Sequence, residues 1–401
     1  MRSITERAIH RFHYDGLFGT LNAGATLLFK KKPAGFFLHY PQLTIEDLSQ
    51  SKTKVAASYT EMIDYSGSLH VSSPANLRKA EGEFEIAERY VYELSESELI
   101  GNSPLIRVQN KYLVPTTLGL DTSFGREIFY EDIGPLSAAY YSIAKNKPQN
   151  SIESAFLLTS HRTGMPMWLC EILPRVKRYE QFSDKTGIEP RYIIPKNTKE
   201  VQKQCLRLLG YDEGDWIEWS GEPTSVKRLF VTANLLRRGH GEVSPSPREI
   251  RWLRNRLISA TSDIDDKFSN LIYVSREDAE RRLVRNETQV MDLLRPFGFE
   301  RYEPGRYTLR EQISMFNNAD IIVGPHGAGL SSLLFAENAT VIELLSEEGP
   351  PTYHFFLLSQ ELGLDYDFLL CDVVGKGIKP RHKDLVANID NLRNAIQSIS
   401  I

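Results

Sequence analysis

A glycine-rich turn between a predicted strand and a predicted helix carries the strongest chemical signal in the sequence. The run Ile321-Ile-Val-Gly-Pro-His-Gly-Ala-Gly-Leu330 places an apolar strand before the turn and a helix beginning near Leu330 after it. Free N–H groups at such a helix start, with the positive end of its dipole, form a pocket for phosphate. Glycine also lets a ligand approach the backbone closely. We therefore predict that Gly324, Gly327, Ala328, Gly329 and Leu330 bind a phosphate-bearing ligand.

The pattern by itself leaves a second explanation open. The spacing GxxGxG is neither the Walker P-loop nor the dinucleotide fingerprint, and glycines between a strand and a helix commonly mark only a tight turn. His326 inside the turn favours a functional role. A buried imidazole with satisfied hydrogen bonds is the structural alternative.

Arginines follow the predicted strand Leu271–Val274. Arg276 comes just past the strand end, at the same sheet edge as the glycine turn. A guanidinium is planar, always charged and bidentate, which suits a diphosphate. Three further arginines follow on a helix predicted from about 278 to 294, namely Arg281, Arg282 and Arg285. A solvated helix face explains most of these; Arg276 is the favoured ligand residue and Arg282 joins it as a candidate.

Three other residues are candidates for chemistry at the ligand. Glu343 lies in the middle of the apolar strand Val341–Leu345, and burying an acid is costly unless donors reach it. Ribose hydroxyls or a structural arginine could supply them. His161, after a buried strand, and Glu171, on a helix, could each act as a general base. An ion pair with Arg175, four residues on, is the alternative for Glu171.

Metal and cysteine chemistry is poorly supported. Asp263-Ile-Asp265 and Asp365-Tyr-Asp367 both spell DxD, but neither has a third ligand nearby, and hard cations require several oxygens. We expect both to be incidental, with no metal and no other cofactor required. Cysteines are few and far apart, so no disulfide framework or CxxC site is predicted. They are Cys170, Cys205 and Cys371.

Composition restricts the class of protein. At about 100–200 residues per domain, a chain of 401 residues predicts two or three domains. Lys plus Arg count 48 against 52 Asp plus Glu, a net charge of −4, which gives no basic footprint for nucleic acid. The N-terminus lacks the apolar core of a signal peptide. The early apolar run Ala25–Phe29 is far shorter than the ~20 residues that span a bilayer. We expect a cytoplasmic protein without a transmembrane segment.

Alternating strands and helices predict the fold class, α/β with parallel sheets. We expect a β-rich N-terminal region over residues 1–140, with strands such as 35–39, 89–92 and 105–108, and a first α/β half over residues 150–222. Residues 221–226 read as a linker, and a second α/β unit follows over residues 226–401. Capping boxes open two of its helices, at Ser246-Pro-Arg-Glu249 and Thr308-Leu-Arg-Glu311. Open α/β sheets bind ligands at the carboxyl ends of their strands, so a cleft between the two units is predicted.

The order and spacing of these motifs resemble glycosyltransferase family 61 over roughly residues 150–375. That family includes bacterial capsular-polysaccharide enzymes, plant xylan arabinosyl- and xylosyltransferases and animal O-linked GlcNAc transferases. The segments that carry the resemblance are Trp168–Arg175, Tyr273–Arg276, Arg282, Asn286-Glu287, Gln312, Ala319-Asp320, Gly324–Leu330 and Val341–Glu343. The resemblance implies a GT-B-like fold with two Rossmann-like domains and an inverting, metal-independent transfer from a nucleotide-diphosphate sugar, usually a UDP-sugar.

Carried over to matching positions, the resemblance implies roles for individual residues. Arg276, His326 and the glycine turn would hold the diphosphate, Glu343 would lie at or near the ribose, and Glu171 would occupy the acidic position near the acceptor. This chain departs from the family at Gly164–Met167, where the family usually has a histidine before the tryptophan, and at Ser331-Ser332 in place of Thr-Asn. The first departure removes a polar group on the acceptor side and leaves His161 as the alternative catalytic base.

The sequence thus predicts a glycosyltransferase of capsule or other surface-polysaccharide biosynthesis. Its expected partners are a nucleotide-sugar donor and a glycan or polysaccharide acceptor, with peripheral membrane or protein-complex association possible. In this interpretation residues 226–401 bind the donor, residues 150–222 form the acceptor side, and residues 1–140 recognise an acceptor or a partner. The alternative is a non-catalytic member that binds a nucleotide sugar, or serves as a scaffold, within a polysaccharide assembly complex.

Overall fold

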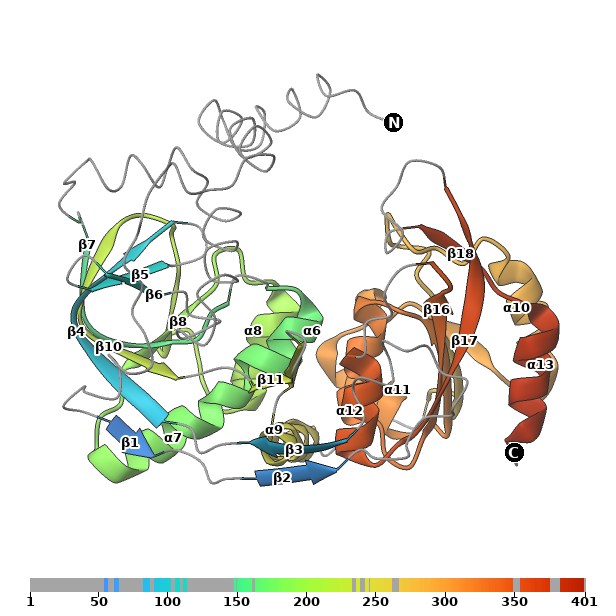
Figure 1. Cartoon of the computed structure of the whole chain (residues 1–401), viewed down its shortest axis with the longest axis horizontal. Helices are drawn as coiled ribbons and strands as arrows, with labels where there is room; N and C mark the ends of the chain where they lie inside the picture. Colours follow the sequence, from blue (N-terminus) through green and yellow to red (C-terminus); the bar gives the residue numbers. More distant parts are fainter. Residues whose placement is uncertain are drawn as a thin grey trace, which may run out of the picture.

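The computed structural model describes a large part of the chain. The described residues are 54–56, 61–64, 82–86, 90–101, 105–108, 111–113, 148, 150–160, 163–232, 236–238, 242–244, 246–261, 267–348, 354–375 and 383–399. They form two mixed sheets, each with helices packed on it, that lie side by side with one helix at the base between them (Figure 1). The strand predicted at 35–39 and the apolar run at 25–29 lie outside the described residues.

The first sheet combines N-terminal antiparallel strands with a parallel βαβ portion. Its order is β6-β5-β4-β10-β7-β8-β9, and β1 also pairs with β4. The strands are β1 (Lys54–Ala56), β4 (Tyr90–Ile100), β5 (Leu105–Val108), β6 (Lys111–Leu113), β7 (Asn150–Leu157), β8 (Arg191–Ile194), β9 (Trp216–Glu218) and β10 (Thr224–Thr232). The strand predicted at 105–108 is confirmed to the residue, and β4 begins one residue after the predicted start at 89.

The position of β10 corrects the predicted division of the chain. We expected a linker at 221–226 and the second unit from residue 226. Instead β10 pairs antiparallel with β4 and parallel with β7, so it is a central strand of the first sheet. The side chains of Val226, Leu229 and Val231 are buried in the first sheet. Their burial explains the apolar run that we assigned to the second unit. The antiparallel strands of the N-terminal region belong to the same sheet as well.

Helices cover the parallel half of this sheet. They are α6 (Met165–Met167), the π-helical turn η2 (Trp168–Ile172), α7 (Pro174–Thr186) and α8 (Glu200–Leu208). Pro174 separates two of these helical segments: η2 ends at Ile172, and α7 begins with Pro174 in its first turn. A proline has no N–H to donate, so it fits a first turn and not a helix interior.

The second sheet is doubly wound. It runs β14-β13-β15-β16-β17-β18, with parallel pairing throughout except for β18. The strands are β13 (Leu271–Val274), β14 (Glu300–Tyr302), β15 (Ile321–Pro325), β16 (Thr340–Ser346), β17 (Asp365–Val374) and β18 (Asp384–Val386). Because β13 has β14 on one side and β15 on the other, the strand order reverses between β13 and β15. Such a switch point is where open α/β sheets bind ligands.

Helices pack on both faces of the second sheet. They are α10 (Glu287–Leu294), η3 (Arg295–Phe297), η4 (Pro304–Arg306), α11 (Leu309–Asn317), the 3-10 helix η5 (Ala328–Phe335), α12 (His354–Leu362) and α13 (Ile389–Ser398). The predicted helix from about 278 to 294 was wrong in its first half, since α10 begins only at Glu287. Residues 276–283 are an irregular loop, so Arg281 and Arg282 do not lie on a helix face.

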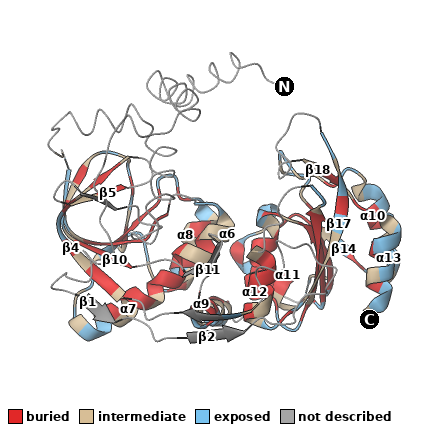
Figure 2. Ribbon diagram, in the orientation of Figure 1, coloured by how far each residue is buried: buried red, intermediate tan, exposed pale blue. Residues whose placement is uncertain are grey.

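One helix joins the two halves through a shared core. α9 (Pro247–Ser259) begins at Ser246, whose side chain accepts a hydrogen bond from the Glu249 N–H as the capping box predicted. Leu253 and Leu257 of α9 are fully buried in a cluster that contains residues of both sheets. Figure 2 shows these buried residues along the facing helices and sheets, with exposed residues on the outer sides of α10 and α13. The halves are therefore packed together and not merely tethered.

Polar contacts of α9 reinforce this arrangement. Arg178 of α7 and Glu249 form a buried ion pair at 2.9 Å, and Arg254 donates to the carbonyl of Ala336, just after η5. The hairpins β2–β3 (Glu61–Asp64, Glu83–Ile86) and β11–β12 (Leu236–Arg238, Glu242–Ser244) complete the described elements.

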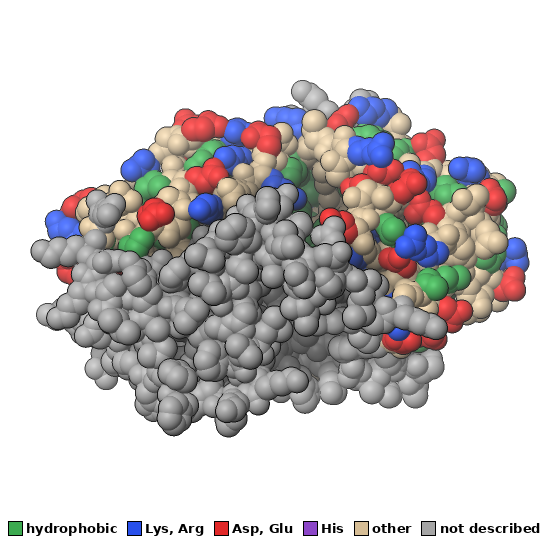
Figure 3. All heavy atoms as spheres, turned by 90° about the horizontal axis from the view of Figure 1, so that it is seen from above, with side chains coloured by type: hydrophobic (Ala, Val, Ile, Leu, Met, Phe, Trp, Pro, Cys, Tyr) green, Lys and Arg blue, Asp and Glu red, His purple; other side chains and the backbone are tan. Residues whose placement is uncertain are grey.

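The surface reflects the balanced composition of the chain. On the face seen in Figure 3, acidic and basic side chains of the described residues are interspersed. Among the described residues, no helix has the length and apolarity that crossing a membrane requires.

Candidate functional site

The glycine turn follows β15, as predicted, and the strand order places it at the switch point of the second sheet. β15 ends at Pro325, His326 donates its N–H to the Leu344 carbonyl at 3.0 Å, and η5 begins at Ala328. The helix therefore starts two residues earlier than predicted and is a 3-10 helix. It begins at the edge at which β13 also ends, because β13 and β15 are neighbouring parallel strands.

Each glycine of the turn allows a close contact with the neighbouring strand or its loop. A Cβ added to Gly324 would lie 2.9 Å from the Val274 Cβ and 3.1 Å from its carbonyl oxygen. A Cβ at Gly329 would lie 2.9 Å from the Val274 Cγ1. These two glycines thus allow β15 and η5 to pack against β13. Gly327 differs, because its Cβ would lie 1.7 Å from Nη1 of Arg276.

The guanidinium of Arg276 thus packs against the backbone of the turn at Gly327. Its Nη2 donates to the Arg281 carbonyl at 3.4 Å, while its Nε is buried without a hydrogen-bond partner. Burial and the nearby positive charge of Arg282 lower the pKa of Arg276 to about 10. The side chain stays charged at neutral pH, with donor capacity that the described residues do not satisfy. An unsatisfied buried charge is costly, so an anion would stabilise this arrangement.

Arg282 supplies a second guanidinium with the same character. Its Nε is also buried without a hydrogen-bond partner, and its backbone has φ +59° in the left-handed region. A residue with a long side chain seldom adopts that conformation, which is found preferentially at functional sites. Burial lowers the pKa of Arg282, the Glu343 carboxylate opposes this, and Arg281 adds to it. Two cationic side chains are therefore held close together beside the turn.

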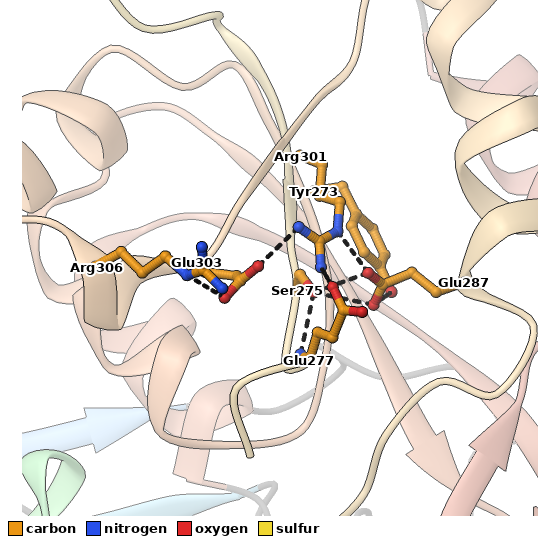
Figure 4. Close-up of polar contacts among 7 residues, drawn as sticks. All are labelled: Tyr273, Ser275, Glu277, Glu287, Arg301, Glu303 and Arg306. Carbon is orange, nitrogen blue, oxygen red and sulfur yellow. Dashed lines mark hydrogen bonds and ion pairs between the residues drawn. The ribbon is translucent and has the colours of Figure 1, made fainter.

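A polar cluster around Arg301 anchors the start of this loop (Figure 4). Arg301, on β14, donates Nε to Glu287 at 2.6 Å and Nη1 to Glu303 at 2.8 Å, and its Nη2 contacts Glu277. Ser275 donates its hydroxyl to Glu287 at 2.8 Å. Burial lowers the pKa of Arg301, but the hydrogen bonds to Glu287 and Glu303 outweigh this and raise it above its ordinary value. Arg301 thus carries a permanent charge that three carboxylates share.

Glu343 is fully buried, and both of its carboxylate oxygens have partners. Oε1 lies 2.5 Å from Nδ1 of His326, and Oε2 accepts a hydrogen bond from the Tyr366 hydroxyl at 2.6 Å. Burial and the Glu343 charge hold the pKa of Tyr366 well above its usual range. The donors are thus a histidine and a tyrosine, where we had considered ribose or an arginine. The contact with Glu343 fixes the orientation of the His326 ring. A contact between Glu343 and ribose stays a prediction.

On the first sheet, Glu171 lies in the π-helical turn η2 and is partly exposed. The expected relation to Arg175 takes a different form, because Arg175 donates Nε to the main-chain carbonyl of Glu171 at 3.0 Å. Burial and the charges of Glu361 and Glu171 raise the pKa of the Cys170 thiol, so Glu361 lies near η2. Glu361 is on α12, so η2 faces the second half of the molecule. His161 lies outside the described residues.

The described residues hold no group of three or more His, Cys, Asp or Glu side chains suited to a metal ion. Asp365 and Asp367 lie within β17, and Oδ1 of Asp367 accepts a bond from the Phe368 N–H. Asp263 and Asp265 lie outside the described residues. The prediction that no metal is required stays a prediction.

Sequence reasoning assigned no role to three residues that the geometry brings to the site. Tyr366 was passed over as the middle of a DxD pattern, Arg301 carried no signal of its own, and Asn286 entered only as part of the family resemblance. Asn286 holds the chain after Arg282 by bonding to Ala387. β17 is the neighbour of β16, so the need of the buried Glu343 for a donor on an adjacent strand was the one signal that could have found Tyr366.

Comparison with known proteins identifies the middle of the chain. Residues 167–342 match the protein-family model described as Glycosyltransferase 61. The match includes Glu171, the arginine-bearing loop and the glycine turn, and it ends one residue before Glu343. No curated protein matches the chain.

Proposed function

Because the chain belongs to glycosyltransferase family 61, we propose that it moves a sugar from a nucleoside-diphosphate sugar to a hydroxyl of a glycan or polysaccharide, with inversion at the anomeric carbon. A UDP-sugar is the first candidate donor. One observation carries the proposal: Arg276 and Arg282 each keep a buried Nε without a hydrogen-bond partner beside the glycine turn. The diphosphate is the ligand that matches two adjacent cations.

The diphosphate is also the leaving group, which gives these residues a catalytic purpose. As the bond from the anomeric carbon to the diphosphate oxygen breaks, negative charge grows on that oxygen. Arg276, Arg282 and the N–H groups that open η5 stabilise it, and preorganised stabilisation of this kind is commonly the largest single contribution to catalysis. His326 is a further proposed ligand residue, and the contact of its Nδ1 with Glu343 fixes the position of its ring. These groups neutralise the diphosphate, so the proposal requires no metal and no other cofactor.

On the acceptor side, Glu171 is the proposed general base. The acceptor hydroxyl oxygen attacks the anomeric carbon from the face opposite the diphosphate, and its proton passes to the Glu171 carboxylate. Both electrons of the broken bond leave with the nucleoside diphosphate. His161 is the alternative base. In this scheme the two sheets act as the donor and acceptor halves of a GT-B-like enzyme, with the acceptor against the first sheet.

The biological setting in this proposal is cytoplasmic synthesis of a capsular or other surface polysaccharide. Acceptor chains of this kind grow at membranes, so peripheral association with a membrane or an assembly complex belongs to the same proposal. Donor chemistry can be tested without knowing the acceptor.

The test is turnover across a panel of nucleotide sugars, each incubated with magnesium and with chelator. Released nucleoside diphosphate is quantified, and the anomeric configuration of the product is read by NMR with an oligosaccharide acceptor. The proposal expects one donor class to react, with chelator having no effect and configuration inverted. Binding of a nucleotide sugar without release of diphosphate, with every acceptor tried, would favour the non-catalytic alternative. Product with retained configuration would overturn the mechanism.

A further inference from the structure

The loop that carries the two cationic side chains is fastened at both ends. We call residues 276–282 the arginine loop, from Arg276 to Arg282. It has no regular secondary structure, and a loop with two like charges and a left-handed residue would not keep one conformation by itself. Fixing the backbone costs about 1–2 kcal/mol per residue. Contacts at both ends of the loop offset that cost.

The first fastening holds the residues that begin the loop. The hydroxyl of Ser275 accepts the Glu277 N–H at 3.2 Å and donates to Glu287 of α10. Glu277 and Glu287 both bind Arg301 on the neighbouring strand β14. Figure 4 shows the guanidinium of Arg301 between these carboxylates. A lysine would retain the charge of Arg301 but not the planar fork that reaches several partners at once.

The second fastening holds the residues that follow the loop. Asn286 donates Nδ2 to the Ala387 carbonyl at 2.8 Å and accepts the Ala387 N–H through Oδ1 at 2.9 Å. Its side-chain amide therefore pairs with the main chain beyond β18 as another strand would. Leu283, directly after Arg282, donates its N–H to the Asp384 carboxylate at 3.0 Å and accepts the Leu385 N–H at 2.8 Å.

We propose that Asn286 and Arg301 are positioning residues that hold Arg276 and Arg282 together in the geometry that binds a diphosphate. This inference rests on the proposed function. Neither residue needs to touch the ligand. Each keeps the loop ordered in the free protein, so that the ligand does not have to order it, and preorganisation of this kind appears as affinity. Asn286 acts mainly on Arg282, which precedes the second fastening, and Arg301 acts mainly on Arg276.

The test is a double-mutant cycle on nucleoside-diphosphate affinity, measured by calorimetry with UDP as the probe. We expect Asn286→Ala to weaken UDP binding about tenfold, equivalent to about 1.4 kcal/mol. In the Arg282→Ala background the same substitution should change affinity less than twofold, because Asn286 then has no cation to position. Asn270→Ala is the matched control. It removes an asparagine side-chain bond at the opposite end of β13, and it should leave UDP affinity unchanged.

Several outcomes would overturn the inference. Equal losses in both backgrounds, or an unchanged affinity for Asn286→Ala, would show that Asn286 does not act through Arg282. Should Asn286→Ala fail to fold, Arg301→Lys in an Arg276→Ala cycle provides the same comparison, with the same expected tenfold loss and the same contradictory result. If wild-type protein does not bind UDP or any other nucleoside diphosphate, the proposed function fails and the inference falls with it. If the wild-type protein binds a nucleoside diphosphate but the two substitutions do not couple, the inference is rejected and the proposed function is retained.

Discussion

Replacing Gly327 by alanine separates binding from folding at the glycine turn. The backbone of Gly327 has φ 165°, an extended conformation that any residue adopts, so alanine adds no backbone strain. The added Cβ would instead lie 1.7 Å from Nη1 and 2.4 Å from Cζ of Arg276. The flexible end of a side chain can move away from such a clash. Gly327→Ala should therefore displace the Arg276 guanidinium and leave the fold intact.

The size of the effect follows from what Arg276 contributes. A hydrogen bond to a charged group contributes about 1.5–3 kcal/mol, and each 1.4 kcal/mol is about a factor of ten. Gly327→Ala should thus weaken nucleoside-diphosphate binding by about 10- to 100-fold. The free energy of unfolding, measured by urea denaturation, should change by less than about 0.5 kcal/mol.

Gly324→Ala is the contrasting variant. Its Cβ would meet the Cβ and carbonyl oxygen of Val274, and that main chain is fixed in the sheet by its neighbours. Overpacking of this kind costs about 1–3 kcal/mol of stability. Calorimetric titration and denaturation of both variants therefore give opposite patterns. Normal diphosphate affinity in Gly327→Ala would refute the assignment of Arg276 and of the turn to the ligand.

Three further predictions concern single side chains. Glu171→Gln should abolish sugar transfer and leave diphosphate affinity unchanged; normal turnover would transfer the role of base to His161. Tyr366→Phe should lower the free energy of unfolding by about 1–3 kcal/mol, because a buried oxygen of Glu343 loses its donor, and unchanged urea stability would contradict the bond. Hydrogen bonds from Lys267 and from Thr308, the N-cap residue of α11, lower the pKa of Glu311 to about 2 from 4.5. Glu311 therefore stabilises the fold above pH 4.5, and this contribution is lost as the pH falls towards 2. Glu311→Gln should flatten acid denaturation across that range, and an unaltered pH profile would reject the assignment.

The sequence predicted local elements well where one pattern dominated. The strand at Leu271–Val274 has the predicted bounds, and Thr308 and Glu311 form the predicted reciprocal cap at the start of α11. Each depends on neighbours within a few residues, so the local sequence contains the information. The juxtaposition of Arg276 with the glycine turn was also predictable, because parallel neighbouring strands end at the same edge.

Features set by tertiary pairing were not predictable in this way. We assigned the chain from residue 226 onward to a new unit because the sequence does not say which earlier strand residues 224–232 join. Their pairing with β4 and β7 decides it. Residues 278–286 have helical composition, yet Asn286 pairs with Ala387, about a hundred residues on, and the chain stays irregular. The partners of Glu343 come from the adjacent strand and turn, which the sequence could only suggest.

Calorimetric titration of the wild-type protein and of Arg276→Ala with nucleoside diphosphates and the matching monophosphates tests the central claim most directly. The central claim is that Arg276, Arg282 and the glycine turn form a diphosphate site. Wild-type protein should bind one diphosphate at least tenfold more tightly than its monophosphate, and Arg276→Ala should lose most of that preference. Equal affinity for both ligands, or an unchanged preference in the variant, would contradict the account.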